Sequence, residues 1–137
     1  MSTMPTGIRM TKKNRLAILT RAREILSNPY NWASGVLRKE GWDSKGNLSY
    51  RYCALGAVEQ AAYDLGLAEE DYRAFRGGGA AMGYRLGNEI GLEEYAIKTR
   101  RMNVPNVNDT LGWEPTLLLL DEFIAETKKP TPRVKPI

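Results

Sequence analysis

The sequence predicts a mainly α-helical fold, in a single domain of about five helices with one small β-hairpin. Apolar residues recur at helical spacing in several segments, most clearly over residues 53–65. Two segments that favour extended structure, 35–40 and 47–52, flank an Asp-Ser-Lys-Gly turn and predict the hairpin, with an irregular loop as the alternative. The length of 137 residues is that of one domain.

The ends of the chain differ in character from its middle. We expect a flexible leader over residues 1–10, the helical domain over 11–127, and a disordered tail over 128–137, which contains three prolines. No apolar run is long enough for a membrane span, and the start of the chain lacks the apolar core of a signal peptide. A single cysteine cannot form an internal disulfide. These features predict a cytoplasmic protein.

A first helix is expected over residues 11–27, with Thr11 as its N-cap and Asn28-Pro29 as its end. Its charged residues lie outside an apolar stripe, as in an amphipathic surface helix. The stripe consists of Ile18, Leu19, Ala22, Ile25 and Leu26.

The central helix is expected over residues 53–65, and Gly66 supplies its stop. Its apolar face consists mostly of small residues, and a glycine in a helix interior requires a packing reason, so Gly56 predicts a close contact with another helix. The last helix, over 115–127, is so rich in leucine that we expect it to be largely buried. We predict that it packs against the small-residue face, with Gly56 at the contact.

Shorter elements are expected between these two helices. Residues 69–75, 80–89 and 92–97 are predicted as short helices. Residues 103–112 are predicted as a loop, because proline, asparagine, aspartate and glycine favour turns.

The composition excludes much catalytic chemistry. The chain contains no histidine, which removes the Ser-His-Asp and Cys-His arrangements. A lone cysteine cannot supply a thiolate cluster for zinc, so we predict no catalytic residue, no metal site and no cofactor. Cys53, at the start of the central helix, is interpreted as a small packed hydrophobe. A thiol-dependent enzyme that uses Cys53 is the third functional hypothesis.

Two polar or glycine-rich segments are interpreted as structural. Residues 76–83 lack the Gly-Lys-Ser/Thr end of a phosphate loop and are predicted to form a hinge or a helix stop. Residues 106–110 hold two asparagines, an aspartate and a threonine but lack the EF-hand pattern. Turn and capping roles are predicted for them.

Aromatic side chains gather around the predicted hairpin. Exposed tryptophan and tyrosine are enriched at protein interfaces, so the cluster is interpreted as a binding surface. The alternative is that the cluster caps the core. We predict that Trp42 is at least partly exposed, whereas Trp32 can plug the core. The predicted partner-binding residues are Trp42, Trp32, Tyr30 and Tyr50.

The segment Tyr52-Cys-Ala-Leu-Gly-Ala57 resembles an uncharacterised family of small proteins from actinobacteria and their phages. The likeness includes Trp32 upstream, and Asn108-Asp109 and a leucine-rich helix downstream, and it covers about residues 12–125. The chain departs from the family at Tyr52, where tryptophan is common. The resemblance implies a bacterial or phage origin and carries no known activity.

We therefore expect a non-enzymatic protein-binding module, which as a phage product would modulate a host protein in the host cytoplasm. Its partner would be a host or cellular protein rather than a membrane. A weak nucleic-acid-binding protein is the alternative, because the net charge is +4 but the basic residues are spread along the chain.

Overall fold

The computed structural model describes residues 6–71, 75 and 81–130. They form one mainly helical domain with an antiparallel two-stranded hairpin, as predicted. The α-helices are α1 (Lys12–Leu26), α2 (Ala54–Asp64), α3 (Met82–Glu89), α4 (Leu92–Lys98), α5 (Val104–Asn106) and α6 (Trp113–Lys128). The hairpin strands are β1 (Arg38–Trp42) and β2 (Leu48–Tyr52). Two short helical turns are also present: the 3₁₀ turn η1 (Pro29–Asn31) and the π-helical turn η4 (Val107–Leu111).

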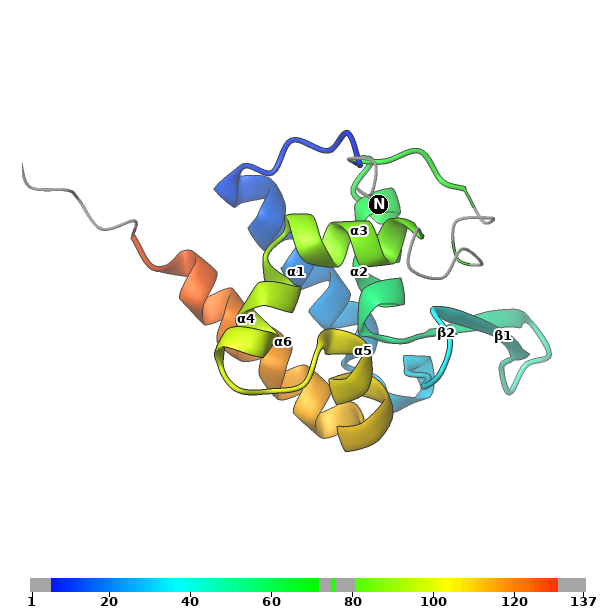
Figure 1. Cartoon of the computed structure of the whole chain (residues 1–137). Helices are drawn as coiled ribbons and strands as arrows, with labels where there is room; N and C mark the ends of the chain where they lie inside the picture. Colours follow the sequence, from blue (N-terminus) through cyan, green and yellow to red (C-terminus); the bar gives the residue numbers. More distant parts are fainter. Residues whose placement is uncertain (1–5, 72–74, 76–80, 131–137) are drawn as a thin grey trace, which may run out of the picture.

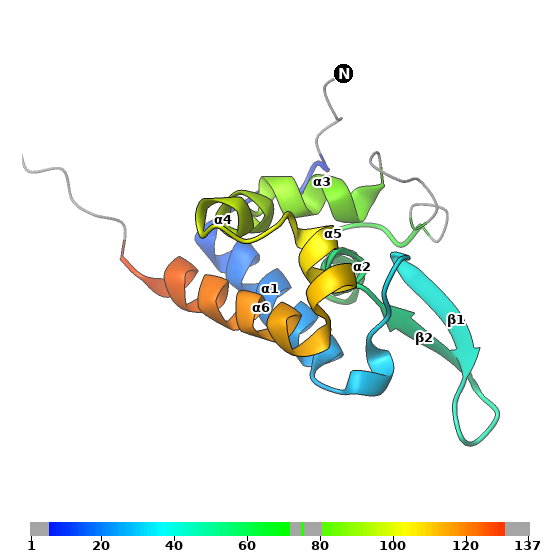
Figure 2. The same ribbon diagram turned by 60° about the horizontal axis from the view of Figure 1, so that its bottom comes forward.

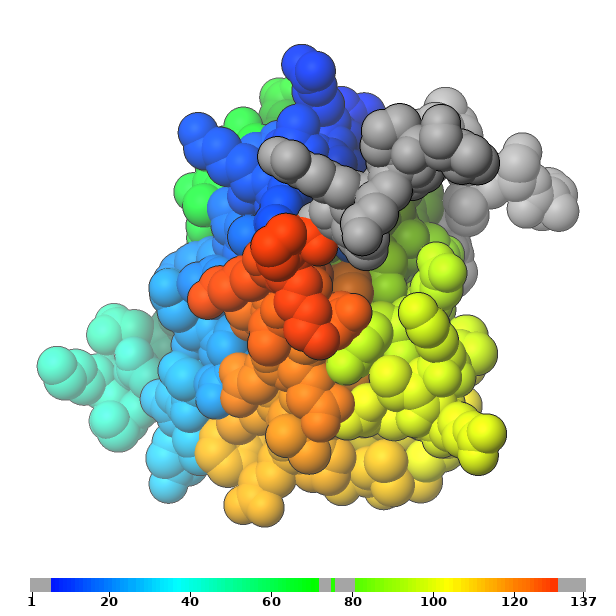
Figure 3. All heavy atoms as spheres, turned by 90° about the vertical axis from the view of Figure 1, so that its left-hand side faces the viewer, coloured from blue at the N-terminus to red at the C-terminus, as the bar shows by residue number. Residues whose placement is uncertain are grey.

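The helices pack in a closed circuit (Figure 1). Helix α1 packs against both α2 and α6, α2 also packs against α3, and α4 contacts both α3 and α6. Helix α5 contacts α2 and α4, and η4 contacts α6. The hairpin projects from this helical body (Figure 2), and its teal tip stands clear of the body in the space-filling view (Figure 3). Within the described ranges, no helix combines the length and the apolar character that a membrane crossing requires.

Helix α1 follows its sequence pattern closely. The hydroxyl of Thr11 accepts a hydrogen bond from the Asn14 N–H at 3.1 Å, so Thr11 is the N-cap, as predicted. All members of the predicted apolar stripe are buried, and this face packs on α2 and α6.

Helix α2 also confirms its prediction, within one residue at each end. Cys53 is the N-cap, with its Sγ accepting from the Gly56 N–H at 3.4 Å. Gly66 adopts a left-handed conformation, with φ +70°, and ends the helix. The small residues of α2 are fully buried in the core.

The predicted contact between Gly56 and the last helix is wrong. Gly56 lies against the backbone of Leu37, where a Cβ would stand 1.7 Å from the carbonyl oxygen. Helix α6 packs instead on α1, α4 and η4. The close helix contact predicted for α2 is made with α3, since a Cβ on Gly83 would stand 2.7 Å from the Leu55 carbonyl oxygen.

Two further predictions about the C-terminal half need correction. The predicted loop over 103–112 contains α5 and η4, because Asn103 caps a turn in which proline occupies a permitted early position. Helix α6 begins at Trp113 and is less buried than expected, since Leu118 is 54% exposed. Only one face of α6 lies against the core; the buried residues of that face are Thr116, Leu119, Leu120 and Phe123.

The predicted leader is in part attached to the domain. Ile8 is buried, and the Thr6 N–H and hydroxyl both donate to the Glu89 carboxylate at 2.9 Å. Residues 1–5 of the predicted leader and 131–137 of the predicted tail lie outside the described residues. So do residues 72–74 of the predicted helix over 69–75, whose first three residues are not helical, and the glycines at 77–79.

We predict that Gly56→Ala lowers the free energy of unfolding by about 3 kcal/mol, the upper end of the usual cost of overpacking. The added methyl group meets a backbone carbonyl, which cannot rotate away as a side chain can. Chemical denaturation measures the effect. Gly41→Ala is the matched control, because a Cβ there meets no atom within 4 Å. Equal stability of the two variants would contradict the contact with Leu37.

Candidate functional site

The Asn108 side chain links three separate segments and is completely buried. Its Oδ1 accepts hydrogen bonds from the Trp32 Nε1–H at 2.8 Å and from the Ala54 N–H at 2.9 Å. Its Nδ2 donates to the Ala33 carbonyl and to Asp109 Oδ1, both at 2.9 Å. An amide has two acceptor and two donor positions, so the side chain is fully satisfied.

Asp109 extends this network to the start of the hairpin. Its Oδ1 also accepts from the Gly35 N–H at 2.8 Å, and Gly35 has φ +79°, a conformation that favours glycine. We call the side chains of Asn108 and Asp109 and the groups that they bind the Asn108 clasp. The clasp fixes the chain before β1 and after β2, so it anchors both ends of the hairpin to the helical body.

The structure separates the four predicted partner-binding residues into three environments. Trp42 and Tyr30 are highly exposed, at 74% and 75%, and both border an open hollow between η1 and the hairpin. Trp32 is half-buried and belongs to the clasp, which matches its suggested role as a plug. Tyr50 is half-buried, with the Arg38 guanidinium 4.3 Å from its ring centre.

We call the hollow between η1 and the hairpin the hairpin groove. Its volume is about 740 Å³, within the usual range of binding pockets. Lys39 and Arg51 line it and are directly opposite each other in the strand register. Residues two apart on a strand share a face, so Gly41 and Ser49 continue the same wall toward Trp42.

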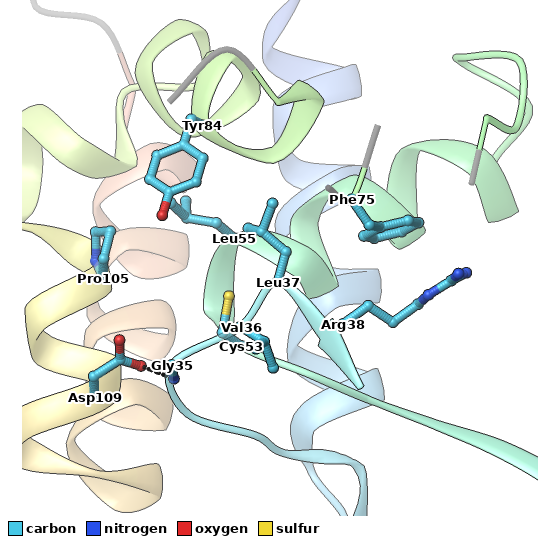
Figure 4. A pocket seen from close by; sticks show the side chains of 10 residues that line it. All are labelled: Gly35, Val36, Leu37, Arg38, Cys53, Leu55, Phe75, Tyr84, Pro105 and Asp109. Carbon is cyan, nitrogen blue, oxygen red and sulfur yellow. Dashed lines mark hydrogen bonds between the residues drawn. The ribbon is translucent and has the colours of Figure 1, made fainter. Parts of the chain in front are cut away.

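A smaller cavity of about 270 Å³ lies at the base of the hairpin (Figure 4). Tyr84, Pro105 and Asp109 lie on one side of it, and Phe75 and Arg38 on the other. Cys53 also lines this cavity, and burial raises the pKa of its thiol to about 11. The thiol is therefore protonated at neutral pH and a poor nucleophile. Its surroundings fit the interpretation of Cys53 as a small packed hydrophobe.

Glu59 is a carboxyl group in the core between α2 and α3. It is completely buried and accepts hydrogen bonds from the Tyr63 hydroxyl and the Gly83 N–H, both at 2.8 Å. Burial raises its pKa to about 7, although both hydrogen bonds and the positive charges of Arg38 and Arg85 act in the opposite direction. Glu59 is thus close to its titration point at neutral pH.

No three histidine, cysteine, aspartate or glutamate side chains gather as metal ligands in the part of the chain that the structure describes. A family model described as a family of unknown function (DUF6197) matches residues 10–126. The chain belongs to this family. The match includes the hairpin and the Asn108 clasp. No curated protein and no solved structure matches the chain.

Sequence reasoning missed the main features of this DUF6197 site. Residues 106–110 were expected to form turns and caps, yet Asn108 makes contacts across more than 50 positions of sequence. The available signal was the adjacent Asn-Asp pair between two helix-forming segments. The sequence also offered a signal for Glu59. It is the one acidic residue in the stretch 53–62, which otherwise consists mostly of small or apolar residues.

We predict that Asn108→Ala lowers the free energy of unfolding of the DUF6197 chain by at least about 3 kcal/mol. The change leaves the Trp32 indole N–H, the Ala54 N–H and the Ala33 carbonyl without their partner, and each unsatisfied buried group costs roughly 1–3 kcal/mol. Urea denaturation measures the loss. Asn106→Ala changes an exposed asparagine two residues away and should have little effect. A mild effect of Asn108→Ala would show that the clasp is unimportant.

We predict that Glu59→Gln changes how stability depends on pH. Because the pKa of Glu59 is raised from 4.5 to about 7 in the folded protein, the folded state holds this proton more tightly than the unfolded state. Its contribution to stability is therefore fully present below about pH 4.5 and is lost as the pH rises to about 7. Denaturation of wild type and Glu59→Gln across this range should show wild type losing stability relative to the variant. A constant difference would contradict the raised pKa.

Proposed function

We propose that this DUF6197 chain is a non-enzymatic protein-binding module that uses the tip of the hairpin and η1 as its contact surface. The observation that carries the proposal is the exposure of two large aromatic residues, Trp42 and Tyr30, on the borders of one groove. Tryptophan and tyrosine dominate binding hot spots because they bury a large area and lose few rotamers on binding.

The attachment of the hairpin supports this role. A two-stranded hairpin is marginally stable when isolated, whereas this one is held at both ends by the Asn108 clasp. A binding surface that is held in place before binding loses less conformational entropy when the partner arrives. The clasp thus supplies the rigidity that an exposed aromatic surface needs for tight binding.

The biological setting is part of the proposal. The resemblance to small proteins of actinobacteria and their phages supports a phage-encoded protein that modulates a host protein in the host cytoplasm. The partner would then be a bacterial protein. The family description names no function that argues for another setting.

The two other hypotheses have less support. Nucleic-acid binding would use free basic residues on α1, but Arg21 pairs with Asp64 at 3.0 Å and Arg23 pairs with Asp121 at 2.7 Å. A thiol-dependent enzyme would need a reactive thiolate, but the Cys53 thiol is buried and its pKa is raised.

We predict that Trp42→Ala weakens partner binding by about 2 kcal/mol, or roughly 30-fold, and leaves the melting temperature almost unchanged. The side chain is exposed, so its loss costs the fold little but removes contact area from the interface. Affinity capture from a lysate of the presumed host identifies the partner, and titration calorimetry with the purified partner measures the change.

The matched control is Leu118→Ala, which shortens an exposed apolar residue on α6, outside the groove. It should bind the partner as wild type does. The proposal fails if Trp42→Ala binds normally, or if it unfolds and thereby shows that Trp42 belongs to the core.

A further inference from the structure

We infer that the hairpin groove receives an extended segment of a partner protein that carries one or two carboxylates next to an apolar side chain. The inference rests on the proposed function and adds the chemistry of the partner. It follows from the charges of the groove, its aromatic borders and the acidic residues at its rim.

The first argument is the charge of the groove wall. Lys39 and Arg51 are directly opposite each other on adjacent strands, and both are exposed. Neither side chain makes an ion pair or a hydrogen bond within residues 6–71, 75 and 81–130. Like charges in a directly opposed pair destabilise a hairpin. A carboxylate placed between the two would relieve this repulsion and form charge-assisted hydrogen bonds with both.

The second argument is the arrangement of apolar surface around this pair. Trp42 and Tyr30 border the same groove and are the two most exposed large hydrophobic side chains in the described part of the chain. A single carboxylate would leave these rings in water. A segment with an apolar residue beside its acidic one would cover a ring while the carboxylate binds Lys39 and Arg51.

The third argument favours a protein segment over a nucleic acid. Glu40 and Asp43 also line the groove. Their carboxylates confine the positive charge of the groove to the Lys39–Arg51 pair, whereas a polyphosphate backbone binds best along a continuous row of cations. Asp43 is held in place because its Oδ1 accepts the N–H groups of Lys45 and Asn47 at 2.9 Å. The groove therefore suits a partner segment in which a short acidic stretch has uncharged neighbours.

A yeast-displayed library of random ten-residue peptides, sorted against the full-length protein, tests this inference. Peptides enriched by wild type should carry aspartate or glutamate beside an apolar residue, and Trp42→Ala should lose their binding. The double variant Lys39→Glu/Arg51→Glu should instead enrich peptides with lysine or arginine. Lys39→Glu alone should bind the wild-type peptides at least tenfold more weakly.

Two controls separate binding from folding. Lys39→Glu places an acid opposite Arg51, so its melting temperature should not fall while its binding does. Lys45→Glu makes the same charge change on the turn, outside the groove lining, and should bind as wild type does.

The remaining outcomes overturn the inference in distinguishable ways. If the enriched peptides lack acidic residues but still depend on Trp42, the proposed function stands and the acidic character of the partner is rejected. Displacement of the peptides by a ten-nucleotide single-stranded DNA that binds more tightly would assign the groove to nucleic acid. No enrichment, or enrichment that does not depend on Trp42, would contradict both the inference and the proposed function.

Discussion

One buried amide, that of Asn108, lies where the hairpin and the helical body meet. Its oxygen accepts from the Trp32 indole and from the first amide of α2, and its nitrogen donates to the Ala33 carbonyl. Each of these groups would cost roughly 1–3 kcal/mol if it were buried without a partner. Neither the Trp32–Ala33 segment nor the start of α2 could move alone without breaking these bonds. The position of the hairpin therefore depends on a side chain more than 50 positions away in the sequence.

This dependence connects the core to the surface that we propose for binding. Gly35 and Ala54, on either side of the hairpin, are both bound by the clasp. Beyond the clasp the strands leave the body, and Trp42 is exposed at the far end of β1. The same strands place Lys39 opposite Arg51, where their repulsion is tolerated because the hairpin does not have to be stable alone. A rigid base thus permits a tip whose exposed and like-charged residues add little to the stability of the fold.

Local features of the fold were predictable from the sequence, and tertiary partners were not. Helical spacing and Thr11 as a cap predicted α1, and the turn residues between extended segments predicted the hairpin. Gly56 was correctly expected to make a close contact, but spacing cannot show which backbone comes near, and it proved to be that of Leu37. Asn108 looked like a turn residue because its partners lie far away in the chain. The exposure of Trp42 was predictable from its place next to a turn.

Hydrogen exchange at the Ala54 amide tests the role of the Asn108 clasp most directly. Ala54 is the first residue of α2, and amides in the first turn of a helix have no partner within the helix. The Lys12 amide, in the equivalent position of α1, is the internal reference. If the clasp holds the hairpin in place, the Ala54 amide and the Trp32 indole N–H should exchange only on global unfolding, while Lys12 exchanges quickly. Exchange of Ala54 as fast as that of Lys12 would contradict this account.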